Sequence, residues 1–152
     1  MKKMYLLLAL VLAAAAAAYP ASANAPAQHS IEDVTGDVFV CDDAVYTVTS
    51  GVIRVTIHEG SSASGNMNFT GTLVPQGVVV EDAEGNAYSV KGAVWFGGTL
   101  NAQQGTEQFT STTFLNIVSS GGGVVDAVRV VFHVSPNGQI VDIDFGSCAE
   151  PE

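Results

Sequence analysis

The stretch VRVVFHVSPNGQIVDIDF, residues 128–145, carries the pattern that decides the fold. Apolar residues occupy alternate positions on both sides of the central SPNG, with Arg129, His133, Asp142 and Asp144 among the residues between them. A repeat of two places alternate side chains on opposite faces of a β-strand, and Pro-Asn-Gly is typical of a tight turn. The stretch therefore predicts a β-hairpin with one apolar face and one face in water, on which we expect Asp142 and Asp144.

The same alternation recurs along the chain from Val38, and no segment beyond the leader carries a helical repeat. The predicted strands cover residues 44–59, 66–74, 78–82, 87–101, 107–118, 124–134 and 139–146. Stretches rich in Gly, Asn, Ser and Pro separate these runs, and we interpret Pro75-Gln76-Gly77 as a short turn. Gly97-Gly98 predicts a bend or bulge inside the fourth run, and Ser50-Gly51 predicts a break inside the first.

Short connections between successive strands predict a small all-β domain built as an antiparallel meander. We expect a closed barrel of about eight strands, with residues 44–49 and 51–59 counted separately. The strand count must be even because the two ends of the domain are expected to meet. A seven-stranded β-sandwich is the alternative architecture.

The first 23 residues have the organisation of a secretory signal peptide. Lys2 and Lys3 precede an apolar run that ends before Pro20, and small residues follow at positions 21–23. This run is shorter than the roughly 20 residues that a membrane-spanning helix needs. We expect a signal peptide at 1–23, a flexible lead-in at 24–37 and one domain at 38–152. The predicted mature protein is secreted by a bacterium and has no membrane span.

The chain has two cysteines, Cys41 and Cys148, near the two ends of the predicted domain. In an exported protein such a pair predicts one disulfide bond. The bridge closes a loop of about 100 residues, which in the chain-entropy model stabilises the fold by up to about 4–5 kcal/mol. The alternative is two free thiols, which are open to oxidation outside the cell.

The chain is acidic, with 15 Asp and Glu residues against 5 Lys and Arg and a formal net charge of −10. Loss of the leader removes two lysines and leaves Arg54, Lys91 and Arg129 against all 15 acidic residues, a net charge of −12. A surface of this charge repels nucleic acids and anionic lipid headgroups. The composition therefore argues against nucleic acid as a partner and favours solubility outside the cell.

Short stretches between residues 41 and 150 have a familiar composition. They are WFGG at 95–98, NAQ at 101–103, GTEQFT at 105–110, VSPNG at 134–138 and DFGSC at 144–148. In these stretches the chain resembles a group of small secreted bacterial proteins, largely actinobacterial, with a signal peptide and two cysteines. That group has no assigned activity. The resemblance therefore implies export and a β fold, and it transfers no catalytic residue.

Trp95, Lys91 and Arg129 are the candidate ligand-binding residues. Trp95 lies on the polar phase of its strand, so it is either partly exposed, as in many binding surfaces, or buried by a bulge at Gly97-Gly98. Lys91 and Arg129 share the phase opposite the main apolar set. They form an anion pocket inside a barrel only if that face points inward, whereas apolar faces normally do so.

Asp82, Glu84 and Asn86 surround a glycine turn and are the candidate Ca²⁺ ligands. The loop is too short for an EF-hand, and a polar hairpin tip explains the same residues. His58 and His133 are predicted at opposite rims of the fold, on strands that run in opposite directions, too far apart to share a metal ion. No Gly-x-Ser-x-Gly motif is present, and we assign no catalytic residue.

These patterns favour a secreted, non-enzymatic β-barrel protein that needs no cofactor. We expect its partner to be a small molecule or an extracellular or cell-envelope component, because a barrel of this size is either packed solid or holds one small ligand. Two alternatives stay open. One is an enzyme of the cyclase or dirigent type, in which a small barrel steers a reaction with few catalytic groups. The other is a structural protein stabilised by Ca²⁺.

Overall fold

The computed structural model describes residues 26–41, 44–62, 65–101 and 103–144. In these residues the chain forms eight antiparallel strands in one sheet and no helix, which confirms the all-β meander. The strands are β1 (Gln28–Asp33), β2 (Val38–Cys41), β3 (Ala44–Ser61), β4 (Asn66–Glu81), β5 (Ala87–Asn101), β6 (Thr106–Val118), β7 (Val124–Val134) and β8 (Ile140–Asp144). Their order across the sheet is β1-β3-β4-β5-β6-β7-β8, with β2 also paired to β3.

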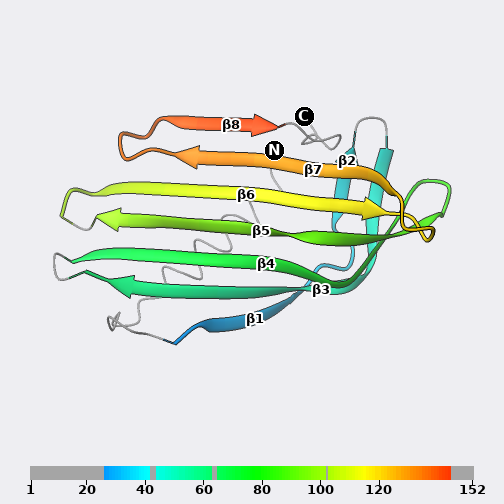
Figure 1. Cartoon of the computed structure of the whole chain (residues 1–152), viewed down its shortest axis with the longest axis horizontal. Helices are drawn as coiled ribbons and strands as arrows, with labels where there is room; N and C mark the ends of the chain where they lie inside the picture. Colours follow the sequence, from blue (N-terminus) through cyan, green and yellow to red (C-terminus); the bar gives the residue numbers. More distant parts are fainter. Residues whose placement is uncertain (1–25, 42–43, 63–64, 102, 145–152) are drawn as a thin grey trace.

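The sheet is open. Figure 1 shows β8 along one edge and β1 along the other, and no pairing joins these two strands in the described part of the chain. A closed barrel is therefore not confirmed. β1 and β2 lie one after the other along β3, with Asp33 opposite Val52 and Val38 opposite Thr47. The segment expected as a flexible lead-in thus contributes a strand, β1. All six of its residues are exposed, so none of them had to be apolar and the alternation that predicts a strand is missing.

The predicted turn at Pro75-Gln76-Gly77 and the predicted break at Ser50-Gly51 are both wrong, because β4 and β3 continue through them. Instead the sheet has a crease there. Residues 74–78 of β4 lie opposite the shorter segment 90–93 of β5, and the register between β3 and β4 also shifts between Val48 and Val52. An extra residue in one strand bends it and increases its twist.

Two glycines make the crease possible. Gly51 and Gly92 have φ angles of 115° and 123°, values that strain residues with a side chain. A Cβ atom on Gly51 would lie 2.4 Å from Cα of Val78, and one on Gly92 would lie 2.0 Å from the carbonyl oxygen of Phe114. The backbones therefore approach too closely at the crease for any other residue.

Beyond the crease, β2 and the first part of β3 fold over one end of the sheet (Figure 1). The Tyr46 hydroxyl on β3 donates a 2.5 Å hydrogen bond to the Asp126 carboxylate on β7. Burial and this hydrogen bond raise the pKa of Tyr46 far above its ordinary value. Tyr46 therefore ties the folded-over part to a strand four positions away in the sheet.

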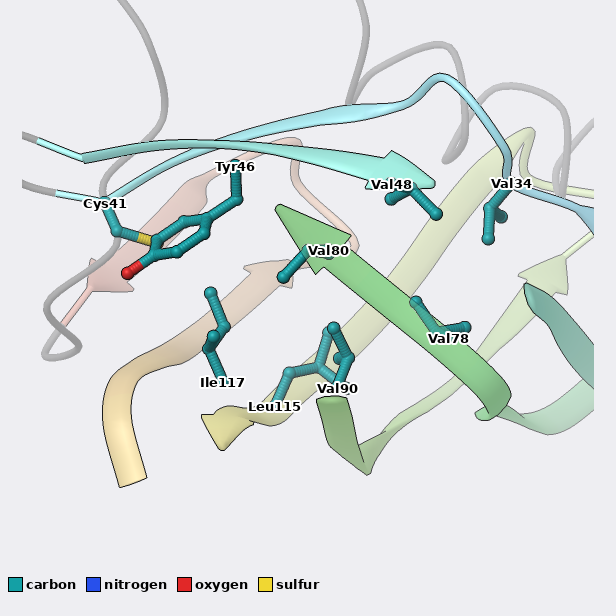
Figure 2. Packing of buried hydrophobic residues seen from close by; sticks show 9 residues of the cluster. All are labelled: Val34, Cys41, Tyr46, Val48, Val78, Val80, Val90, Leu115 and Ile117. Atoms are coloured by element: carbon teal, nitrogen blue, oxygen red, sulfur yellow. The ribbon is translucent and has the colours of Figure 1, made fainter. Parts of the chain in front are cut away.

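The main core lies under this fold-over. In Figure 2 Cys41, Tyr46 and Val48 point from β2 and β3 toward valine, leucine and isoleucine side chains of β4, β5 and β6. The buried members are Val34, Cys41, Tyr46, Val48, Val78, Val80, Val90, Leu115 and Ile117. Two layers of apolar side chains therefore close this end of the molecule.

A second cluster occupies the other end of the same face, which we call the inner face. Phe69 and Phe109 stack with their ring centroids 6.2 Å apart, and Phe96 completes the buried set. The register pairs Phe69 with Gly98 and Phe96 with Gly71, so each ring lies over a glycine of the neighbouring strand. Pairing is continuous through Gly97-Gly98 on both sides of β5, so the predicted bulge is wrong there.

Candidate functional site

The candidate site lies on the outer face, opposite the two clusters. Trp95 on β5 is 50% exposed and Phe114 on β6 is 39% exposed, which is unusual for such large side chains. Their rings meet edge to face with centroids 6.4 Å apart. The guanidinium of Arg129 lies 5.0 Å from the centre of the Phe114 ring. The three side chains thus form one cation–aromatic row across β5, β6 and β7.

A shallow depression lies beside Trp95. Gly97, which carries no side chain, forms its floor, with Thr70 and Thr110 directly opposite on the two neighbouring strands. The other outer-face residues that line it are Asn68, Trp95, Thr99, Gln108 and Thr112. Hydroxyl and amide groups therefore surround an exposed indole on a flat, open surface.

Hydrogen bonds hold part of this lining in place. The Thr99 hydroxyl donates a 2.8 Å hydrogen bond to the side-chain oxygen of Asn68. The Thr110 hydroxyl and Nδ1 of His133 lie 2.7 Å apart. Polar groups that are already positioned in this way lose less conformational entropy when they bind a ligand.

Lys91 and Arg129 belong to the same outer face. Nη1 of Arg129 donates hydrogen bonds to the carbonyl oxygens of Leu115 and Val128 at 2.6 and 2.9 Å, and Nη2 donates to the side-chain oxygen of Asn116. Asn116 lies directly opposite Lys91 in the register. The fold therefore brings Trp95, Arg129 and Lys91 into one region. The face points outward, so they line no anion pocket inside a barrel.

The sequence pattern did not point to Phe114 or the threonines as site residues. A signal was present in the sequence, because Phe69-Thr70-Gly71-Thr72 is repeated as Phe109-Thr110-Ser111-Thr112. The register places these two segments on either side of β5, with the phenylalanines inside and the threonines outside. The repeat builds matching walls on both sides of Trp95 and Gly97.

His58 and His133 lie in the same row of the outer face, not at opposite rims. The register runs from His58 to Thr70, Gly97, Thr110 and His133. The prediction of opposite rims is wrong because β4 is one strand rather than two, so β3 and β7 run in the same direction. The two histidines are four strand spacings apart, roughly 19 Å, too far to share a metal ion.

Asp82, Glu84 and Asn86 meet in the β4–β5 turn, where Asp82 organises the loop. One of its oxygens accepts the backbone N–H groups of Glu84 and Asn86, and the other accepts the Asn86 amide and the Tyr88 hydroxyl. These hydrogen bonds, above all that from the Asn86 side chain, lower the pKa of Asp82. The Asp82 carboxylate is therefore hydrogen-bonded by the turn itself. Among the described residues no three His, Cys, Asp or Glu side chains are grouped as metal ligands.

Cys41 is 1% exposed and belongs to the main core, whereas Cys148 lies outside the described residues. The bridge between them stays a prediction. The described part of the chain contains no helix long and apolar enough to cross a membrane. Comparisons with protein-family models, with curated proteins and with solved structures found no match for this chain.

Proposed function

We propose that the chain is an exported, non-enzymatic binding protein whose outer sheet face binds a polysaccharide. The observation that carries this proposal is the half-exposed Trp95, which Phe114 supports edge-on beside a depression lined by hydroxyl and amide groups. Sugar C–H groups carry partial positive charge and pack on the negative face of an aromatic ring. Sugar hydroxyls exchange hydrogen bonds with Thr, Asn and Gln side chains.

The shape of the surface favours a polymer over an enclosed small molecule. Pockets for small ligands bury most of the ligand surface, whereas the depression at Gly97 is shallow and open. Because the sheet is open between β1 and β8, we place the ligand on the outer face rather than inside a barrel. Adjacent strands lie about 4.8 Å apart, a spacing close to the length of one sugar unit. A chain lying across the strands can therefore present one unit to each.

Trp95 is the only tryptophan, so its fluorescence reports directly on the proposed site. We expect a change in emission when a binding polysaccharide is titrated from a panel that contains a neutral glucan and a polyuronate. Trp95→Ala should weaken binding about tenfold or more, because losing a central aromatic anchor costs more than ~1 kcal/mol. Calorimetry measures the affinity of this variant, which has no tryptophan.

Val45→Ala is the matched control, because Val45 is 48% exposed but lies on the folded-over part of β3. Its affinity should equal that of the wild type. Gly97→Val is a second test, since it fills the floor of the depression without removing the indole. Its affinity for the polysaccharide should fall. Circular dichroism checks that each variant is folded. The proposal fails if no member of the panel binds, or if Trp95→Ala binds as tightly as the wild type.

A further inference from the structure

The outer face of β3 to β7 differs in charge from the rest of this acidic protein. The cations Arg54, Lys91 and Arg129, which are all the basic residues beyond the leader, occupy it. The outward-facing positions between the row of Asn116 and the row of Asn68 contain no Asp or Glu. A chain with 15 acidic residues therefore keeps this part of its surface free of them.

The carboxylates of the described strands lie elsewhere, except Asp33 on the edge strand β1, which is opposite Val52 and so on the same phase as Arg54. Glu59 is opposite Phe69 and Glu107 is opposite Leu100, on the inner-face phase near the strand ends. Asp126 is also on this phase and accepts the Tyr46 hydroxyl. Glu81 and Asp82 stand at the β4–β5 turn beyond the crease. At physiological ionic strength charges are screened within about 8 Å, so a ligand on the outer face responds mainly to the nearby cations.

Among the described residues no ion pair to a carboxylate is seen for these cations. Arg129 is held by the carbonyl oxygens of Leu115 and Val128 and by Asn116, all of them uncharged. Arg54 and Lys91 are exposed. Arg54 and Arg129 lie on strands four spacings apart, a span of roughly 19 Å, with Lys91 on a strand between them. The positive charge is thus spread across the width of the face.

We propose that the polysaccharide is anionic and carries carboxylate groups, which Arg54 and Lys91 contact while Trp95 stacks on a sugar ring. This inference rests on the proposed function and adds the charge of the ligand to it. A neutral polysaccharide would leave both cations without a role in binding. Arg54 lies two strands from Trp95, and Lys91 lies four residues from Trp95 on the same strand, so both cations are within a few sugar units of the stacked ring.

The test compares a polygalacturonate with its methyl-esterified form, in which the backbone is the same and the charge is removed. We expect the acid form to bind at least tenfold more tightly. Its affinity should fall about tenfold as NaCl rises from ~50 to ~500 mM, because salt screens exposed charges. Binding of the ester should change little with salt.

Arg54→Gln and Lys91→Gln should each weaken binding of the acid form severalfold and leave binding of the ester unchanged. Ser120→Glu is the matched control, because it changes the net charge by the same single unit at an exposed turn between β6 and β7. This control should bind as the wild type does.

The outcomes separate the two proposals. Equal affinity for acid and ester, both lost in Trp95→Ala, overturns the anionic ligand and leaves polysaccharide binding standing. If Ser120→Glu weakens binding of the acid form as much as Lys91→Gln does, binding depends on the net charge of the protein and not on cations at the site. That result also overturns the inference. Binding of neither polymer, together with no binding in the wider panel, overturns both.

Discussion

At the scale of the residue, Asp82 shows how one side chain can hold a hairpin turn. Its two oxygens accept four hydrogen bonds from Glu84, Asn86 and Tyr88. Asp side chains commonly bond to backbone N–H groups that follow them and so mimic a turn. The predicted hairpin turn is confirmed, and these contacts explain the roles of Asp82 and Asn86 in it.

We expect Asp82→Ala to lower the melting temperature, because the acceptors that hold the turn are removed. The pKa of Asp82 is lower in the folded protein than its ordinary value of 3.8, so the carboxylate stabilises the fold above that pH. Its contribution is lost as the pH falls through the folded-state pKa. The melting temperatures of wild type and variant should therefore differ most at neutral pH and converge in acid. Thermal unfolding from neutral to acid pH measures this difference.

Glu84→Ala is the control, because Glu84 contributes only a backbone N–H to Asp82. Its melting temperature should be close to that of the wild type. Millimolar Ca²⁺ should change the melting temperature of neither protein. A rise in melting temperature with Ca²⁺ that disappears in Glu84→Ala would instead support a calcium-stabilised protein.

At the scale of the element, the phenylalanine cluster of the inner face depends on glycines in the neighbouring strands. A Cβ atom at Gly98 would lie 2.3 Å from the carbonyl oxygen of Gln108 and 2.8 Å from the ring of Phe69. Its φ lies outside the positive range, so the requirement for glycine is one of space. Gly98 therefore lets β5 pair closely while the ring of Phe69 covers it.

Gly98→Ala should destabilise the protein by about 1–3 kcal/mol, the usual cost of inserting a group into a packed core. Urea unfolding measures the loss. Gly60→Ala is the control, because a Cβ atom there meets nothing within 4 Å. If both variants unfold at the same urea concentration, the close approach at Gly98 contributes nothing to stability.

At the scale of the whole molecule, the folded-over end contains the main core and one of the two cysteines. Cys41 is buried beside Tyr46 and Val48 in that core. A bridge from Cys41 to Cys148 would link β2 to the end of the chain that follows β8. It would therefore restrain the unfolded chain over most of the length of the domain.

Cys148→Ser should lower the free energy of unfolding by up to about 4–5 kcal/mol, the value of a loop of this length in the chain-entropy model. This substitution removes the bridge and leaves the Cys41 side chain in the core. Reductant should destabilise the wild type by a similar amount and leave Cys148→Ser unchanged. Alkylation of both cysteines in the native protein without reductant would contradict the bridge.

The sequence alone determined the all-β class and the turns at 82–86 and 135–138, because alternation and turn chemistry are local properties. It also singled out Trp95, Lys91 and Arg129, because their phase opposes the apolar set. The tertiary structure alone decided that β4 continues past Pro75, since that depends on close approaches between strands at the crease. The same continuity sets strand direction, and with it the end of the sheet at which His58 and His133 lie. The register then decides which threonines, histidines and cations share one row of the outer face.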